Sequence, residues 1–307
     1  MLSVVICTYN PNVDILSPVL KALKIQSLPI NNWELIIVDN NSSINSVQEL
    51  EIAWHTDSKI VVEKNQGLAY ARIRGVQEAK YELIVFIDDD NVADENYLQR
   101  CIEIQNSNNN LGIFGGKALP VFYKHQPPNW VVDFTGLLGC RDLGQNELRT
   151  QVVDNKVVAY PSFSPIGTGM CIRKTVFMLY VAEIRNDNFR QNLGRKGKAL
   201  TSGEDNDIVI TALKNGWQVA YFPQLLINHL IPEKRTSKKY LAAMNFAQNK
   251  SWVALLRFHK ISSWNNIPKW TVPLRKIKAY FTYKAWQNEV NYIKWRGACG
   301  MFEGLAK

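Results

Sequence analysis

Short apolar runs and amphipathic segments alternate along the first third of the chain. The apolar runs have the length of buried strands, and they occupy residues 2–7, 33–38, 59–63 and 83–87. Between them, apolar residues recur at helical spacing, which predicts helices at residues 14–26, 46–54 and 68–80. This alternation predicts an α/β fold with a mainly parallel sheet, right-handed crossovers and helices on both faces.

The run at residues 83–87 stops at three consecutive carboxylates, Asp88, Asp89 and Asp90. In open α/β sheets, ligands bind just beyond the carboxyl ends of the strands. Three adjacent negative charges need compensation from a hard cation, a basic side chain or water. The triplet therefore indicates a cation site, with a solvated acidic turn before a helix near Asp94 as the alternative.

Polar loops also follow two of the other predicted strands. Thr8-Tyr9-Asn10-Pro11 follows the first strand, and Asp39-Asn40-Asn41-Ser42-Ser43 follows the second. These loops are expected to converge on one edge of the sheet, where a nucleotide would bind. Neither G-x-G-x-x-G nor the G-x-x-x-x-G-K-S/T phosphate loop is present. The acidic triplet with a bridging cation is therefore the better candidate for holding phosphate.

The second half of the predicted α/β region is less regular. Residues 111–160 suggest an irregular or antiparallel insertion, and residues 165–173 place two glycines beside a short strand, as a ligand surface or a plain turn would. Residues 203–207 open a helix that runs to a stop at Gly216. Three carboxylates occur there within four positions, although capping needs one. Strands are predicted at residues 217–222 and 225–230, the latter carrying His229.

The charge of the chain is concentrated at its C-terminal end. Residues 231–307 hold 15 of the 36 Lys and Arg but three of the 27 acidic residues, so they carry +12 while the remainder carries −3. Helices are predicted at residues 236–258 and 273–295, where basic residues alternate with Trp, Tyr and Phe. This composition suits an anionic membrane interface. The alternatives are a helical annex with solvated lysines and, less favoured, a nucleic-acid surface.

The remaining composition favours a cytoplasmic protein, with peripheral attachment to the inner face of the membrane as a further expectation. The five cysteines are scattered without a C-x-x-C spacing, which argues against a disulfide framework and a zinc site. No apolar run approaches the roughly 18 to 20 residues of a membrane span. The first residues also lack a basic leader.

Five motifs in order resemble family 2 glycosyltransferases with the GT-A fold. They are Val-Val-Ile-Cys-Thr-Tyr-Asn-Pro, Ile-Val-Asp-Asn-Asn-Ser-Ser, Asn-Gln-Gly-Leu-Ala-Tyr-Ala-Arg, Phe-Ile-Asp-Asp-Asp and Gly-Glu-Asp. The resemblance covers a predicted catalytic domain at residues 1–232, with a nucleotide-binding half at about 1–110 and an acceptor half at about 111–232. Residues 233–307 form the predicted basic, aromatic helical segment. The resemblance implies transfer of a sugar from a nucleotide-diphosphate donor with inversion.

The resemblance also implies roles for individual residues near the donor. Thr8, Tyr9 and Asn10 would hold the nucleotide, and Asp39 would accept a hydrogen bond from a uracil ring. Mn²⁺ or Mg²⁺ bridging the diphosphate would be bound by Asp88, Asp90 and His229, with a structural role as the alternative for His229. Asp89 would contact the ribose or the donor sugar, and Arg72 and Arg235 would hold the diphosphate, with surface ion pairs as the alternative for both arginines.

On the acceptor side, the resemblance implies that Asp205 is the catalytic base and that Glu204 orients the acceptor, a glycan or a lipid-linked glycan. Two departures limit it. Ile73 stands where many relatives have Asn, and Ser251 replaces the Arg of the Q-x-x-R-W motif of processive members, although Gln248 and Trp252 are kept. A non-processive enzyme is therefore expected. The alternatives are a nucleotidyltransferase, or an inactive transferase domain in a basic membrane- or nucleic-acid-binding protein.

Overall fold

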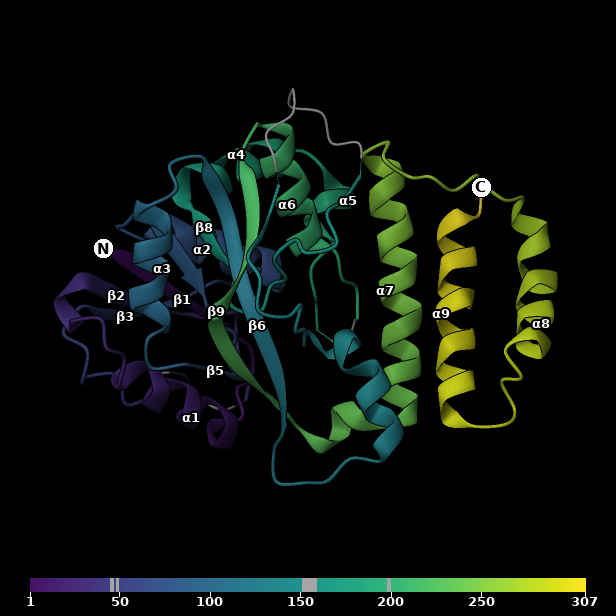
Figure 1. The fold of residues 1–307 in the computed structure, drawn as a ribbon, viewed down its shortest axis with the longest axis horizontal. Coiled ribbons are helices and arrows are strands. Elements are labelled where there is room, and N and C mark those ends of the chain that lie inside the picture. Colours follow the sequence, from purple (N-terminus) through teal and green to yellow (C-terminus); the bar gives the residue numbers. More distant parts are fainter. Residues whose placement is uncertain (45–46, 48–49, 151–158, 198–199) are drawn as a thin grey trace. The chain divides into compact units, whose positions relative to one another are not determined.

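The computed structural model describes residues 1–44, 47, 50–150, 159–197 and 200–307 (Figure 1). Its strands are β1 (Leu2–Thr8), β2 (Trp33–Asp39), β3 (Ser58–Val62), β4 (Leu83–Phe86), β5 (Asn91–Ala93), β6 (Leu111–Phe122), β7 (Leu148–Arg149), β8 (Cys171–Arg173) and β9 (Gln218–Ile231). Its α-helices are α1 (Val13–Lys24), α2 (Leu68–Glu78), α3 (Tyr97–Asn106), α4 (Lys174–Ile184), α5 (Asn188–Gln191), α6 (Glu204–Lys214), α7 (Lys238–Phe258), α8 (Val272–Thr282) and α9 (Glu289–Leu305). The 3₁₀ helices are η1 (Ile30–Asn32), η3 (Asn129–Leu138), η4 (Glu233–Thr236) and η5 (Lys269–Thr271).

The strands form one sheet in the order β3-β2-β1-β4-β8-β6-β9-β5, with β7 paired to β9. Strands β3, β2, β1 and β4 run parallel, and their register places Thr8 beside Asp39 and Asp39 beside Val62. The predicted parallel α/β half is therefore confirmed. Beyond β4 the pairs β4–β8, β6–β8, β5–β9 and β7–β9 are antiparallel. The sheet as a whole is mixed, because the later strands return to it in the opposite direction.

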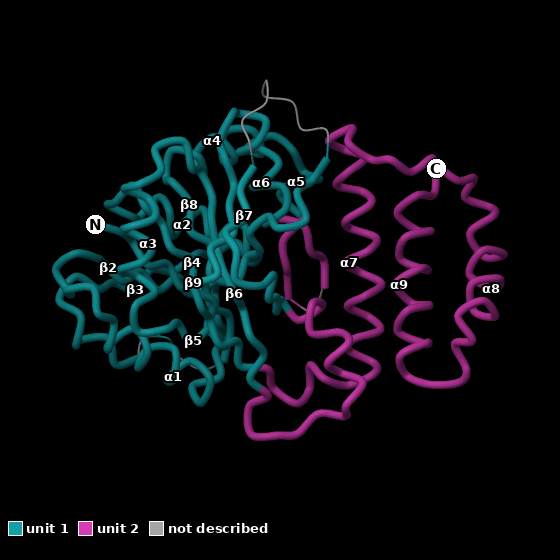
Figure 2. The backbone as a smooth tube through the Cα atoms, in the orientation of Figure 1, with its two compact units in different colours: residues 1–121, 139–192, 205–230 teal, residues 122–138, 193–204, 231–307 magenta. Residues whose placement is uncertain are grey.

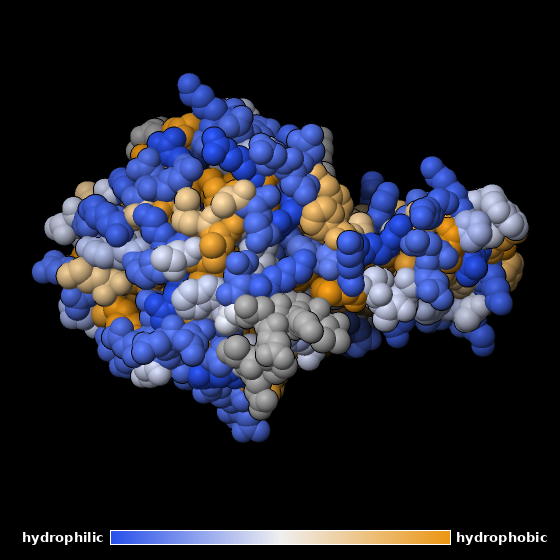
Figure 3. Space-filling view, turned by 90° about the horizontal axis from the view of Figure 1, so that it is seen from above, coloured by the Kyte–Doolittle hydropathy of each residue, from blue (hydrophilic) through white to orange (hydrophobic). Residues whose placement is uncertain are grey.

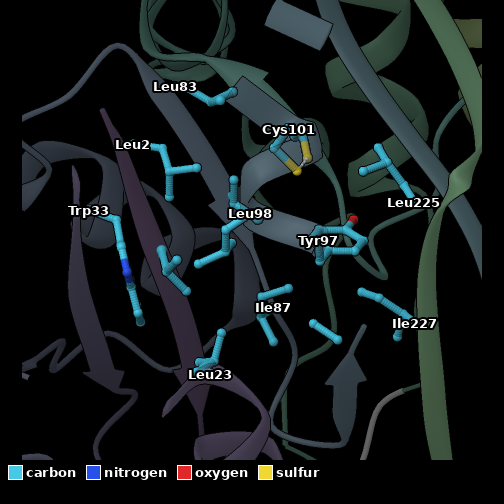
Figure 4. Close-up of a cluster of buried hydrophobic side chains, with 14 of the residues drawn as sticks. Leu2, Leu23, Trp33, Leu83, Ile87, Tyr97, Leu98, Cys101, Leu225 and Ile227 are labelled. Carbon is cyan, nitrogen blue, oxygen red and sulfur yellow. Dashed lines mark hydrogen bonds between the residues drawn. The ribbon is translucent and has the colours of Figure 1, made fainter. Parts of the chain in front are cut away.

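Helices cover both faces of this sheet, as predicted. One apolar core joins Leu2, Val4 and Ile6 of β1 to α1 and α3 (Figure 4). The opposite core joins Val5 of β1 to α2, α4 and α6. The alternation of Val4, Val5 and Ile6 between the two cores is the period-two pattern of a strand that is buried on both faces.

Three sequence-based elements differ from the structure. Residues 50–54 are not helical, and the predicted helix at 46–54 otherwise falls largely outside the described residues. The two strands predicted at 217–222 and 225–230 are one continuous strand, β9. The helix predicted at 273–295 is two helices, because Lys284 adopts a φ of 50° after α8 and Asn288 caps the start of α9.

The chain divides into two compact units (Figure 2). The first contains residues 1–121, 139–192 and 205–230, and the second contains residues 122–138, 193–204 and 231–307. The predicted domain boundary after residue 232 lies two residues from a division between units, which falls after residue 230, but two earlier segments join the second unit. That the chain forms two independent domains divided at this boundary stays a prediction.

The second unit is built around the close contact of α7 with α9, and Figure 1 shows α9 between α7 and α8. Gly297, Gly300 and Gly304 recur at helical spacing on α9, where an added Cβ would meet Asn245, the backbone of Phe246 and Val253 on α7. Glycines on one helix allow the two backbones to approach closely. Among the described residues, no helix combines the length and the apolar character needed to cross a membrane.

Helix α6 of the first unit is held by a buried ion pair. Asp207 is fully buried, and its Oδ2 accepts a hydrogen bond from Nε of Arg190 at 2.8 Å. Arg190 also donates to Glu183 and to the hydroxyl of Thr211. Burial opposes the charged form of Arg190, but the hydrogen bonds and charges of Asp207 and Glu183 raise its pKa. Asp207, one of the three carboxylates at residues 204–207, thus has a structural partner.

Replacing this arginine should destabilise the fold. The variant Arg190→Met would leave the Asp207 carboxylate buried without its cation, so we expect the free energy of unfolding to fall by about 3–5 kcal/mol. Urea denaturation measures this change. The control Arg74→Met removes a more exposed i,i+4 pair with Glu78 and should cost less than about 1 kcal/mol. Equal losses in the two variants would contradict an anchoring role for Arg190.

Candidate functional site

The loops that follow β1 and β2 are joined through Ser42. The backbone N–H of Asn10 donates to Oγ of Ser42 at 2.8 Å, and the backbone N–H of Ser42 donates to Oδ1 of Asp39 at 2.9 Å. Asn10 adopts a φ of 49°, and its Oδ1 accepts hydrogen bonds from the N–H groups of Ser43 and Ile44. The structure thus brings the predicted nucleotide residues Asn10 and Asp39 together, beside the exposed Tyr9.

Asn40 is a residue that the sequence analysis did not assign to the site. Its side chain is buried, with Nδ2 donating to the carbonyl of Asn65 and Oδ1 accepting from the N–H of Gly67, both at 2.7 Å. These bonds tie the loop after β2 to the start of α2. Its place beside Asp39 was the available signal, but a sequence does not show which loop an amide will bridge.

Each carboxylate of the acidic triplet contacts a different part of the first unit. Thr8 Oγ1, at the end of β1, donates to Asp89 Oδ2 at 2.5 Å. Arg72 Nη2, on α2, lies 3.7 Å from Asp88 Oδ1. The remaining carboxylate, Asp90, is reached from β9, where His229 Nε2 lies 3.1 Å from Asp90 Oδ2. The three carboxylates are adjacent in the sequence and repel one another, and each of them has a contact partner of its own.

Asn91 is a second residue that the sequence analysis left unassigned. It is fully buried and lies opposite His229 in the antiparallel pair of β5 and β9. Its Nδ2 donates to Asp90 Oδ1 at 3.0 Å, and its Oδ1 accepts from the N–H of Asp88 at 3.3 Å. Asn91 therefore joins the Asp90 carboxylate to the main chain of Asp88.

The predicted metal ligands are only partly gathered. Among the described residues, no group of three His, Cys, Asp or Glu side chains is arranged to hold a metal ion. Asp90 and His229 are nevertheless neighbours, and His229 is buried with its Nδ1 3.9 Å from the sulfur of Cys140. Mg²⁺ is commonly held by one or two carboxylates together with substrate phosphates. The Asp90 carboxylate fits that requirement, and the neighbouring imidazole of His229 offers a nitrogen ligand beside it.

Asp205 lies at the start of α6 and is oriented by two backbone groups. The N–H of Gly167 donates to its Oδ2 at 3.0 Å, and the N–H of Asn206 donates to its Oδ1 at 2.9 Å. A Cβ added to Gly167 would lie 2.8 Å from Nη2 of Arg72, which is buried. The close approach expected for the glycines at 165–173 is therefore made by Arg72, and Gly167 lies between the residue that contacts Asp88 and the predicted base.

Two further side chains surround Asp205. The hydroxyl of Tyr160 accepts a hydrogen bond from Asn206 Nδ2 at 2.8 Å. Burial and the charge of Asp205 both raise the pKa of Tyr160, so this phenol stays protonated at neutral pH. Arg141 donates to the carbonyls of Ser162 and Ser164, and burial lowers its pKa, which the negative charge of Asp205 partly offsets. Neither Tyr160 nor Arg141 lies in a motif that the sequence analysis used.

Two predicted site residues belong to the second unit and are described within it. Glu204 precedes Asp205 directly, and its side chain is buried. Arg235 lies on η4, where its Nη2 donates to the carbonyl of Leu138 at 3.3 Å. The predicted roles of both residues stay predictions.

Curated relatives are glycosyltransferases and polysaccharide-synthesis proteins. The chain is 22% identical over 256 residues to the glucosyl-dolichyl phosphate glucuronosyltransferase of Haloferax volcanii, covering 81% of this chain and 75% of that protein. It is 22% identical over 258 residues to the succinoglycan biosynthesis protein ExoM of Rhizobium meliloti, covering 82% of this chain and 74% of that protein.

Solved structures of Staphylococcus aureus TarS share the fold. The 1–349 form in complex with UDP-GlcNAc matches with a TM-score of 0.54 at 14% identity, covering 97% of this chain and 90% of that chain. The complex with UDP matches with the same TM-score and identity, covering 99% of this chain and 88% of that chain. Of a longer TarS chain, this protein covers 55%.

The family described as Glycosyl transferase family 2 matches residues 3–177, which is more than half of the chain. This range contains most of β1, all of α2 and the acidic triplet. The resemblance seen in the motifs and the predicted GT-A fold are thus confirmed. The chain belongs to glycosyl transferase family 2 and is a glycosyltransferase.

Proposed function

We propose that this enzyme transfers single sugars from a UDP-sugar to a hydroxyl group of a glycan or lipid-linked acceptor, with inversion at the anomeric carbon. The observation that carries the proposal is the set of contacts from Asp88 through Arg72 and Gly167 to Asp205. It joins the acidic triplet, where the donor diphosphate would bind, to the predicted base. The proposed diphosphate site and the proposed base are therefore separated by only a few side chains, so both can act on the bond between the donor sugar and its diphosphate.

The donor proposal draws on the loops at the carboxyl ends of β1, β2 and β4. Asp39 and Asn10 are held in place by Ser42, so they offer a fixed edge to a base such as uracil. Thr8 and Asp89 are hydrogen-bonded to each other beside this edge. The solved complexes of TarS with UDP and UDP-GlcNAc, which share the fold, support a uridine nucleotide as the donor's leaving group.

The diphosphate would be held by charge from two sides. Arg72 supplies a buried guanidinium, which suits phosphate oxygens. Asp90 and His229 would hold Mn²⁺ or Mg²⁺, with Asp88 close enough in sequence to contribute. Bound there, the cation would offset the negative charge that develops on the departing diphosphate. Asn91 holds the Asp90 carboxylate and the main chain of Asp88 in place for this task.

Asp205 is proposed as the general base. Its carboxylate would accept the proton of the acceptor hydroxyl while the hydroxyl oxygen forms its bond to the anomeric carbon. The bond between that carbon and the diphosphate oxygen breaks in the same displacement, and UDP leaves with the electron pair. Attack from the side opposite the leaving group inverts the anomeric centre. The two N–H donors from Gly167 and Asn206 hold the carboxylate for this step.

The acceptor is proposed from the relatives and from the C-terminal segment. One relative is named for glucosyl-dolichyl phosphate and the other for succinoglycan synthesis, so these names support both a lipid-linked acceptor and a polysaccharide acceptor. Gln248, retained from the Q-x-x-R-W motif, donates to the carbonyl of Leu137. That contact gives Gln248 a structural partner, which is compatible with non-processive transfer.

Removing the proposed base should abolish transfer and spare donor binding. We expect Asp205→Asn to lower the turnover rate by about 10²- to 10⁴-fold, because the amide accepts no proton. The measurement is UDP release from a panel of UDP-sugars, with water and octyl glycosides as acceptors. The control Asp133→Asn changes an exposed carboxylate and should keep the wild-type rate. A wild-type rate for Asp205→Asn would assign the base elsewhere.

Donor binding should require a divalent cation. At about 100 times its dissociation constant, UDP should stabilise the protein by about 2.7 kcal/mol with Mn²⁺, and by much less with EDTA. Thermal unfolding with each combination tests this. Asp90→Asn should lose the Mn²⁺-dependent part, while Asp57→Asn, at an exposed surface pair with Lys80, should retain it. Full stabilisation by UDP in EDTA would refute the metal proposal without touching the role of Asp205.

A further inference from the structure

Helix α8 carries a continuous apolar stripe on its exposed side. Leu274, Ile277 and Phe281 recur at intervals of three and four residues, and Trp270 on η5 precedes them by four. These four residues, called here the α8 stripe, have exposed fractions of 74% for Trp270, 62% for Leu274, 57% for Ile277 and 62% for Phe281. Single exposed apolar residues are ordinary, but a contiguous set on one helix face marks an interaction surface.

The opposite side of α8 is anchored within the second unit. Val272 and Ala279, half a helical turn away from the stripe, are buried. Lys276 Nζ lies 2.5 Å from Glu303 on α9, and Trp295 Nε1 donates to the carbonyl of Lys276 at 3.0 Å. These contacts fix the rotation of α8 about its axis. The stripe therefore faces outward because of how the helix packs, and not because the helix is loosely attached.

The segment that carries the stripe, residues 261–288, has only positive charges. Residues 261–288 contain five Lys and Arg and no acidic residue. Lys269, Arg275, Lys278 and Lys284 are exposed, whereas Lys276 is paired with Glu303. In Figure 3, where α8 keeps the horizontal place that it has in Figure 1, hydrophobic residues in orange lie among hydrophilic residues in blue. The surface thus combines apolar side chains with a surplus of positive charge.

We infer that the α8 stripe binds the surface of an anionic lipid bilayer. In an interfacial helix, Leu, Ile, Phe and Trp enter the boundary between headgroups and acyl chains, while Lys and Arg contact the headgroups. Trp270 lies at one end of the stripe, and Trp286 lies beyond the other end. Trp286 is 54% exposed, and its ring centroid lies 5.7 Å from that of Phe281. Tryptophan is favoured at this boundary because its ring is apolar and its N–H is polar.

Charge decides between a membrane and a second copy of this chain. A two-fold contact between copies would place the same surface against itself. Arg275, Lys278 and their neighbours would then face identical positive charges without a compensating carboxylate in residues 261–288. Anionic headgroups offer the complementary charge. The inference does not depend on the transfer reaction, although attachment to a bilayer would place the enzyme near the lipid-linked acceptor proposed above.

Co-sedimentation of the full chain with vesicles tests the inference. Vesicles of phosphatidylcholine mixed with phosphatidylglycerol should retain at least about tenfold more protein than phosphatidylcholine alone at low salt, and retention should fall as salt rises. The double variant Ile277→Glu/Phe281→Glu should lose about tenfold in retention, since it places two carboxylates at the interface. The matched control Ile25→Glu changes a 68% exposed isoleucine on the first unit and should bind like the wild type.

Two additional readouts make the result decisive. Phosphatidylcholine and phosphatidylglycerol with brominated acyl chains should quench tryptophan fluorescence of the wild type more than that of Trp270→Phe. All variants should keep the wild-type unfolding midpoint, because the substituted side chains are exposed. Absence of retention on anionic vesicles, or equal retention of the double variant, would overturn the inference. So would a concentration-dependent dimer in analytical ultracentrifugation that the double variant abolishes, which would assign the stripe to a second copy.

Discussion

Three adjacent carboxylates at the end of β4 impose the main constraint on the site. Their charges repel, and each one meets a partner that comes from a different element: Thr8 of β1, Arg72 of α2 and His229 of β9. The N-terminal parallel strands and the late antiparallel strand must therefore both be in place before the triplet is compensated. The mixed sheet is the scaffold that allows this, because β9 returns beside β5 and brings its histidine opposite Asn91.

Much of the first unit could be predicted from the chain alone, since the period-two and helical patterns of residues 1–87 reflect burial directly. The acidic triplet and the polar loops were identifiable because they interrupt apolar runs. The bonds of Asn40 and Gly167 were not, since they join residues that lie far apart in the chain, where no periodic pattern connects them. Sequence reveals which residues end a strand, but only the fold shows which of them meet.

The C-terminal segment also shows what could not be predicted from the sequence. Its basic and aromatic composition was evident, yet it was predicted as one helix after residue 273, where the structure has α8 and α9 separated by a turn at Lys284. Lysine has no strong preference for this turn, so composition gave no warning. Helical periodicity also cannot tell a face that packs from one that is exposed. Only the contacts of Val272, Lys276 and Ala279 with the rest of the unit distinguish the two sides of α8.

The hydrogen bond from Gly167 to Asp205 has a consequence for how this enzyme can be studied and engineered. Its donor belongs to the main chain, so no exchange of side chains removes it, and a scan that truncates residues to alanine would report on Gly167 only by adding a carbon beside Arg72. Asp205 is thus positioned by a group that side-chain truncation cannot delete. Libraries intended to alter acceptor choice should leave residue 167 as glycine and vary the side chains around it.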